Sequence, residues 1–263
     1  MKLSKTAMIS AAVAGSLWSL AASAQTFTYS SGDLLAAFRK AGSPDLIVDL
    51  GSASLYQSGT GPFSITGVNS TLLTSVFGSL DGIYWSVFGY VNTSGSPLGA
   101  QNTIWVTDPR SDINFQNDPN SSLSFNGQGS TISKMRAIAD GATSGGATIL
   151  ANQIVEVSSA LNVGGDPVSY TIGVGSLGDF HGTWAPSVEN LTPAGFAASS
   201  TPEISDLFQQ NPGAANVGSY LGDFQLGNNG TLTFVPVPEP SALAMLGAGM
   251  MTLVAVRRIG RKQ

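Results

Sequence analysis

Few side chains in this sequence have the types and spacing that chemistry needs. The chain has one histidine, His181, and no cysteine, so thiolate metal sites, cysteine nucleophiles and disulfides are excluded. Asp179 lies two residues before His181, and on a strand the pair would share one face and could bind a metal with a distant third residue. A serine hydrolase triad of the G-x-S-x-G type would need a turn that the sequence lacks. We therefore expect no enzyme activity and interpret His181 as a loop residue.

A glycine-rich stretch, GVGSLG at residues 173–178, matches the G-x-G-x-x-G pattern of dinucleotide-binding sites. That chemistry requires a helix that opens at the glycines, because the helix N-terminus holds the pyrophosphate. The residues that follow, DFHGTWAP, cannot start a long helix. We interpret the stretch as β-turns and expect no organic cofactor.

Oxygen-bearing side chains gather in TDPRSDINFQNDPNSS, residues 107–122. Calcium takes about 6–8 oxygen ligands from flexible loops, so Asp108, Asp112 and Asp118 are candidate calcium ligands. The stretch is not an EF-hand, because Asn117 stands where that loop needs glycine and Leu123 where it needs glutamate. Asp-Pro and Asn also favour plain turns, so the alternative of no metal stays open.

The charges are unevenly distributed along the chain. Residues 25–237 contain five Lys or Arg against 15 Asp or Glu, a formal charge of −10. Affinity for nucleic acid comes mainly from Lys and Arg at the phosphates, so nucleic-acid binding is excluded. Anionic membrane surfaces should also repel this part of the chain.

The N-terminus has the pattern of a secretory signal peptide. Two lysines precede an apolar run at residues 7–21, and Ala22, Ser23 and Ala24 form an A-x-A cleavage site. Signal peptidase is therefore an expected partner. We predict that the mature protein begins at Gln25.

The C-terminus combines three signals. Residues 241–256 are 16 mostly apolar residues. As a helix they would span about 24 Å, somewhat less than a hydrocarbon core of ~30 Å. Before them, Pro238, Glu239 and Pro240 form an extended, charged tripeptide that a processing enzyme could grip. After them comes a basic cluster that would hold the C-terminus in the cytoplasm, made of Arg257, Arg258, Arg261 and Lys262.

This order of Pro-Glu-Pro, apolar segment and basic tail resembles the PEP-CTERM sorting domain of Gram-negative bacteria. The resemblance implies that a membrane-embedded exosortase recognises Pro238, Glu239 and Pro240, cleaves nearby, and releases or transfers the protein to the cell surface or matrix. An ordinary permanent membrane anchor is the alternative. Three stretches of the body also resemble PEP-CTERM exoproteins of unassigned activity: GDLLAAFRKAGSPDLIVDLGS, YWSVFGYV and DLFQQNPGAANVGSYLGDFQLGNNGTLTFVPVPEP. We divide the chain into a signal peptide (1–24), one exported β-rich domain (25–235) and a sorting signal (236–263) with a transmembrane helix at about 241–256.

The body alternates short apolar runs with Gly-, Asn- and Ser-rich turns, which predicts a mainly β fold, an antiparallel β-sandwich with two or three short helices. We expect a buried central strand at Ile83–Val91 and a tight hairpin turn at Asn229-Gly230. The other predicted strands are Leu46–Leu50, Phe63–Val68, Thr103–Thr107, Ser122–Phe125, Val168–Val174, Tyr220–Leu226 and Thr231–Val235. The predicted helices are 201–213, Ser133–Ala142 and Ala147–Ser158, and Asp33–Lys40 fits a helix or a strand.

The body therefore predicts an architecture more clearly than an activity. We expect Trp85, Trp105 and Trp184 in the core, whereas exposed tryptophans would be sugar-stacking platforms. The favoured hypothesis is an exported, transiently membrane-anchored protein of the cell surface or matrix with a structural or adhesive role. The alternatives are a carbohydrate-binding module for extracellular polysaccharide and a secreted hydrolase with paired carboxylates ~5–10 Å apart.

Overall fold

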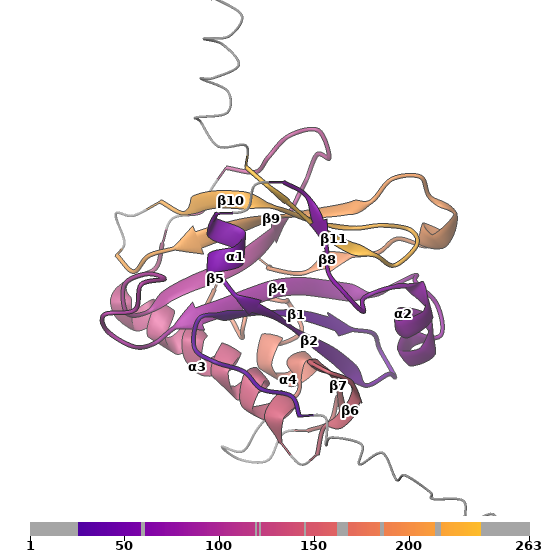
Figure 1. The fold of residues 1–263 in the computed structure, drawn as a ribbon, viewed down its shortest axis with the longest axis horizontal. Helices are drawn as coiled ribbons and strands as arrows, with labels where there is room; N and C mark the ends of the chain where they lie inside the picture. Colours follow the sequence, from indigo (N-terminus) through magenta and orange to yellow (C-terminus); the bar gives the residue numbers. More distant parts are fainter. Residues whose placement is uncertain are drawn as a thin grey trace, which may run out of the picture.

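The computed structural model describes residues 26–58, 61–118, 120, 122–144, 146–161, 168–184, 187–213 and 217–237. Among these residues, 11 strands form one sheet in which neighbouring strands are antiparallel (Figure 1). In chain order the strands are β1 (Asp33–Arg39), β2 (Asp45–Ser52), β3 (Phe63–Ser64), β4 (Tyr84–Val91), β5 (Thr103–Pro109), β6 (Thr148–Ala151), β7 (Ile154–Val157), β8 (Asn190–Leu191), β9 (Glu203–Gln210), β10 (Ser219–Leu226) and β11 (Leu232–Pro236). Their order across the sheet is β3-β11-β10-β9-β5-β4-β1-β2-β7-β6, and β8 pairs with β4.

The described part of the chain also contains four α-helices and one short 3-10 helix. They are α1 (Ser54–Gln57), α2 (Ser70–Phe77), α3 (Phe125–Thr143), α4 (Tyr170–Val174) and η1 (Phe196–Ala198). Side chains cap three of the helices, because the orphan N–H groups of a first turn need acceptors. The caps are Asn69 for α2, Ser124 for α3 and Ser169 for α4.

The sheet curls so that β9, β10 and β11 lie opposite β4, β1 and β2 as two facing layers (Figure 1). Side chains from both layers, such as Phe38, Trp85 and Phe224, fill the space between them as one apolar core. The other face of the layer formed by β4, β1 and β2 packs on α3 and α4. A second core, in which Phe88 and Met135 are buried, lies between them. The domain is therefore a half-barrel with helices on one outer face.

The prediction of a mainly β, antiparallel domain is confirmed, and the prediction of a two-sheet sandwich is wrong in its connectivity. β5 pairs with β9 from Ile104↔Gln210 to Pro109↔Ser205, so the two facing layers belong to one continuous sheet. Residues 201–213 have the signals of a capped helix, yet Glu203–Gln210 is strand β9. It forms a strand because it has hydrogen-bonding partners on both edges, and these outweigh local propensity.

Other predicted elements are confirmed or corrected as follows. Strands β2, β4, β5, β10 and β11 match their predictions, and the ambiguous residues 33–40 contain strand β1. The predicted helix Ala147–Ser158 is instead the β6–β7 hairpin, and the predicted strand Val168–Val174 is instead helix α4. The predicted strand Ser122–Phe125 leads into α3, which confirms and extends the predicted helix Ser133–Ala142. The predicted strand Phe63–Val68 shortens to β3.

The hairpin between β10 and β11 turns one residue earlier than predicted: the Gly230 N–H donates to the Gly227 carbonyl oxygen at 2.8 Å, so Asn228 and Asn229 are the central residues of the turn. Gly230 has a φ of 72°, in the left-handed region that glycine adopts readily. Asn229 contributes through its side chain, whose Oδ1 accepts the Thr231 N–H at 3.0 Å. The turn therefore combines one left-handed glycine with one hydrogen bond to a side chain.

Within the described residues, no helix is long and apolar enough to cross a bilayer. The predicted signal peptide and the predicted membrane segment at 241–256 lie outside the described residues.

Candidate functional site

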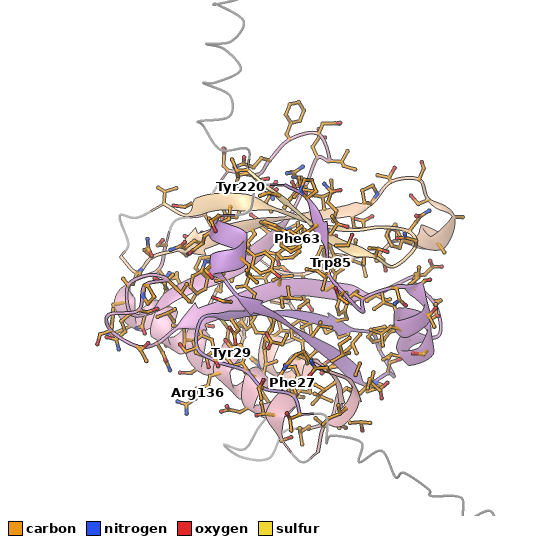
Figure 2. All side chains as sticks on the ribbon, viewed as in Figure 1. Phe27, Tyr29, Phe63, Trp85, Arg136 and Tyr220 are labelled. Carbon is orange, nitrogen blue, oxygen red and sulfur yellow. The ribbon has the colours of Figure 1, made fainter. Side chains whose placement is uncertain are left out.

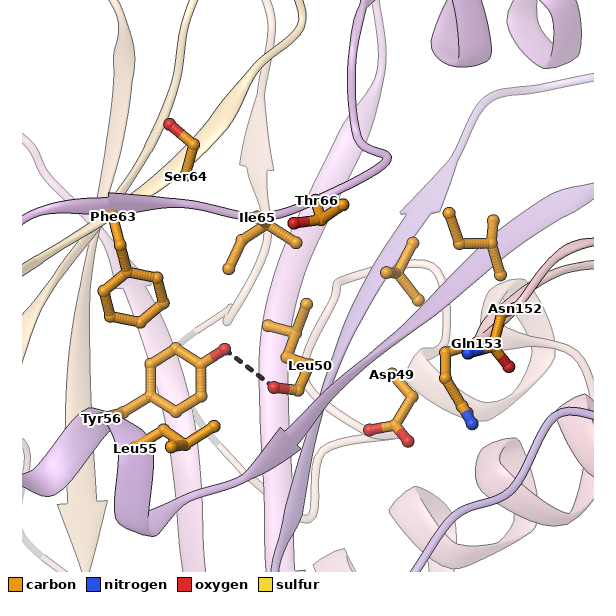
Figure 3. Close-up of a pocket in the computed structure, with 12 residues that line it drawn as sticks. Asp49, Leu50, Leu55, Tyr56, Phe63, Ser64, Ile65, Thr66, Asn152 and Gln153 are labelled. Carbon is orange, nitrogen blue, oxygen red and sulfur yellow. Dashed lines mark hydrogen bonds between the residues drawn. The ribbon is translucent and has the colours of Figure 1, made fainter.

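A pocket of about 440 Å³ opens beside β2, α1, β3 and the β6–β7 turn (Figure 3). Tyr56 and Phe63 form an aromatic wall, with ring centroids 5.6 Å apart. Asp49 and Gln153 lie on the other side of Leu50 in this view. The pocket therefore combines an apolar wall with a polar rim, and it is the first place to look for a ligand.

The polar groups of this pocket are engaged by the protein itself. The Tyr56 hydroxyl donates to the Leu50 carbonyl oxygen at 3.0 Å, and Asp49 Oδ1 accepts the Gly51 N–H at 2.8 Å. The Gln153 side chain bonds Thr28 through both its oxygen and its nitrogen. Asp49 also alternates along β2 with the core residues Val48 and Leu50, so its carboxylate belongs to the opposite face of the strand. These groups do not converge on one point, as a catalytic or sugar-binding site would require.

The raised pKa of Asp49 predicts how the stability of the domain depends on pH. Burial raises the pKa of Asp49 from 3.8 to about 6, and the neighbouring Asp33 charge adds to the shift. Between these pH values the folded state holds a proton that the unfolded state has released, so wild-type stability falls as pH rises from about 4 to 6. Asp49→Asn has no such proton, so above pH 6 it should be more stable than wild type. The expected gain is about 1–2 kcal/mol, below the full shift because solvent screens a partly exposed carboxylate.

Urea unfolding of Asp49→Asn and wild type at pH 4, 5, 6 and 7 measures this difference. Asn keeps the oxygen that accepts the Gly51 N–H, so geometry is preserved. Asp112→Asn is the matched control on an exposed loop. A constant difference across the pH range, or a less stable Asp49→Asn protein at pH 7, would contradict the prediction.

The three tryptophans lie in the cores, as predicted. Trp85 and Trp105 are in the half-barrel core, and Trp184 is in the core beneath the helices. All three are buried, so none of them offers the exposed stacking surface that a carbohydrate-binding module would need. Tyr84, which is partly exposed, has the Arg39 guanidinium 4.7 Å from its ring centroid.

His181 and the glycine-rich stretch lie at the C-terminal end of α4. A His181 ring nitrogen, Nε2, bonds the Ile172 carbonyl oxygen at 2.6 Å, and Asp179 Oδ1 accepts the Gly182 N–H. The loop interpretation of His181 is confirmed, since the residue lies in a turn. Gly173 is inside α4, and the glycine pattern runs out of the helix at Gly175 instead of opening one, so it cannot cradle a phosphate at a helix N-terminus.

The candidate calcium ligands are not brought together. Asp108 accepts a hydrogen bond from Asn120 Nδ2 at 3.1 Å, and Asp112 accepts the backbone N–H of Asn114 at 2.9 Å. Asp118 is exposed. Within the part of the chain that the structure describes, no three His, Cys, Asp or Glu side chains form a group that could hold a metal ion.

A charged network that sequence reasoning missed lies on the outer face of β5, β9 and β10. Strand register places Asp108 opposite Asp206, and Asp206 opposite Asp223. Arg110 neutralises two of them: its Nε donates to Asp206 Oδ1 at 2.8 Å and its Nη2 to Asp223 Oδ2 at 3.1 Å. Burial, together with the neighbouring charge of Asp206, raises the pKa of Asp108 to about 6. The bonded partners are 96 and 113 residues apart in sequence, so no local pattern could reveal them.

The network adjoins the point where the chain leaves the domain. Tyr220 accepts a hydrogen bond from Arg110 Nη2 at 3.1 Å, and the Val237 N–H donates to the Leu221 carbonyl oxygen at 3.2 Å. A register shift in β10 at Tyr220–Gly222 lies beside Pro236, the last residue of β11. The sorting segment therefore starts directly at the folded domain. The predicted functional residues of both termini lie outside the described residues. They are Pro238, Glu239, Pro240, Arg257, Arg258, Arg261 and Lys262 of the sorting segment, and Ala22, Ala24 and Gln25 of the signal cleavage site.

The C-terminal end of the chain is similar to a known protein family. Residues 236–261 match the model of the PEP-CTERM protein-sorting motif. No curated protein and no solved structure matches the chain. The motif implies processing by an exosortase, a protease-like membrane enzyme. The C-terminal end of the chain therefore carries a PEP-CTERM sorting motif, which indicates an exported protein that is sorted to the cell surface.

Proposed function

We propose that this chain is a structural or adhesive protein of the cell surface or extracellular matrix, delivered there by cleavage near Glu239. The observation that carries the proposal is the position of the sorting motif. The matched segment begins at residue 236, inside the last strand of the half-barrel, with no linker between the domain and the signal. Cleavage beside Glu239 thus separates a complete folded domain from the apolar tail.

Proline spacing supports an accessible cleavage site. β11 pairs with β10 on one side, and on the other it pairs with β3 only at Thr233 and Phe234. Pro236, Pro238 and Pro240 recur at every second residue, so they lack N–H donors on the same side of an extended chain. A ladder along the β3 side of this chain cannot continue past Pro236, which blunts that edge against pairing with another strand.

Internal pairing of charges supports a structural role over a hydrolytic one. Arg39 Nε donates to Glu189 Oε1 at 2.6 Å, and Arg110 holds Asp206 and Asp223. These carboxylates serve the packing of the domain, where a hydrolase would aim two of them into a cleft. The buried tryptophans likewise support an architectural role over a sugar-binding one.

Mass spectrometry of both termini of the native protein, in cell and medium fractions, tests the proposal. We expect a mature N-terminus at Gln25, because Ala22 and Ala24 fit signal peptidase. We expect a C-terminus near Glu239 that lacks residues 241–263. Surface protein that retains Gln263 would show a permanent anchor instead, and retention of Met1 would show that the signal peptide is not removed.

A further inference from the structure

Two large apolar side chains are exposed in the loop between β5 and α3. Phe115 is 69% exposed and Ile113 is 40% exposed, whereas most aromatic side chains of the domain are buried. The loop is held in place: Arg110 Nη1 donates to the Ile113 carbonyl oxygen at 3.3 Å, and the Asn117 N–H donates to Asp206 Oδ2 at 2.7 Å. The exposed pair is therefore presented by an anchored loop, which we call the 111–117 loop.

The 111–117 loop stands beside the point where the chain leaves the domain. Arg110, which holds the loop, also bonds Tyr220 and Asp223 on β10. On the other side of the same stretch of β10, Gly222 lies opposite Pro236 and the Leu221 carbonyl accepts the Val237 N–H. Tyr220 lies on the outer side of the layer formed by β9, β10 and β11, away from α3 and α4 (Figure 2). The loop and the exit of the sorting segment therefore share one end of the domain.

The length of chain after β11 brings this end close to the membrane. Four residues, 237–240, separate β11 from the apolar segment that starts at Ser241. At ~3.3 Å per residue they reach at most about 13 Å, which is less than half the diameter of a domain of this size. An inserted segment would hold the exit end of the domain against the headgroup layer.

We propose that the 111–117 loop docks on the lipid bilayer while the tail is inserted, with Phe115 and Ile113 reaching into the interface between headgroups and acyl chains. This rests on the proposed function, because it requires residues 241–256 to enter the membrane. The contact is apolar: the loop contains Asp112 and is followed by Asp118, and the guanidinium of Arg110 is engaged by Asp206 and Asp223. An acidic loop gains nothing from anionic lipid, so the docking must persist at high salt.

The inserted tail acts as a tether that makes this small contact effective. Two side chains give weak affinity when the domain is free, but an inserted tail turns docking into an intramolecular step at high effective concentration. Docking then fixes how the exit end faces a membrane-embedded protease. Cleavage removes the tether, so the same contact no longer holds the domain on the membrane, which suits a protein destined for release or transfer.

Single-cysteine labelling of the full chain tests this, since the native sequence has no cysteine. The variants Phe115→Cys, Leu177→Cys and Ala248→Cys carry a bimane label in vesicles of phosphatidylethanolamine and phosphatidylglycerol. Leu177 is the matched control, because it is 73% exposed and follows α4, on the helical side of the sheet. Nitroxide lipids with the spin at the headgroup or deep in the acyl chain report the depth of each label.

We expect about twofold or stronger quenching of the label at 115 by the headgroup nitroxide, with no decrease in 0.5 M salt, and none at 177. The label at 248 should be quenched by the deep nitroxide. Quenching at 248 without quenching at 115 would overturn the docking proposal and leave the sorting proposal intact. Absence of quenching at 248 would overturn the membrane step on which both rest. Equal quenching at 115 and 177 would show non-specific adsorption and would also overturn the docking proposal.

Discussion

Replacing Pro238, Glu239 and Pro240 with alanine is expected to stop C-terminal processing while leaving membrane insertion intact. The apolar run at 241–256 and the basic cluster after it are unchanged, so the stop-transfer signal remains. The triple variant loses the charge that marks the membrane edge and the two rigid φ angles that keep the site extended. We expect cleavage to fall by about tenfold or more, and full-length protein to accumulate in the inner membrane.

Pulse labelling followed by fractionation measures the ratio of cleaved to full-length protein. Thr233→Ala is the matched control, because it changes a half-buried residue of β11 and leaves Pro236 and the tripeptide unchanged. Control and wild type should be processed at the same rate. If the triple variant is released as efficiently as wild type, the tripeptide is not the recognition element, and the tail is better described as a simple anchor.

The strands that sequence reasoning located share a local signal. Residues 84–91 are buried at seven consecutive positions, and an apolar run of that length between turns has few alternatives to a central strand. β9 lacked such a signal, because Ile204, Leu207 and Phe208 have helical spacing and Thr201-Pro202-Glu203 imitates a helix start. Pairing with β5 and β10 decides its structure, and both partners are distant in sequence.

The contrast between local signals and distant pairing also applies to the sorting motif and the Arg110 network. The sorting motif was predictable because its three signals are contiguous, and each depends only on residue type and order. The Arg110 network and its loop were not, because register between three strands places Asp108, Asp206 and Asp223 side by side. In the sequence these residues are acids in three separate segments, and the calcium hypothesis grouped Asp108 with its chain neighbours instead.

Arg110→Met is expected to cost about 3–5 kcal/mol of folding free energy, because it leaves two carboxylates with little or no solvent contact and without their cation. The side chain of Asp206 is 0% exposed and that of Asp223 is 9% exposed, and Arg110 Nη2 lies 2.7 Å and 3.1 Å from their oxygens. Met fills similar space along the stem, so the loss reports charge more than packing. The stability of Arg110→Lys should fall between those of Arg110→Met and wild type, since one ammonium cannot match the fork geometry of the guanidinium.

Urea unfolding of the full chain in detergent measures these differences. Arg136→Met is the matched control: its side chain is 62% exposed and its pair with Asp140 spans 3.7 Å, so the change should stay within about 0.5 kcal/mol. Adding Asp206→Asn to Arg110→Met should recover part of the loss, because one stranded charge is removed. Equal stability of Arg110→Met and wild type would mean that solvent reaches these carboxylates. Because Arg110 also bonds the Ile113 carbonyl, its removal should release the 111–117 loop and weaken bilayer docking even in molecules that stay folded.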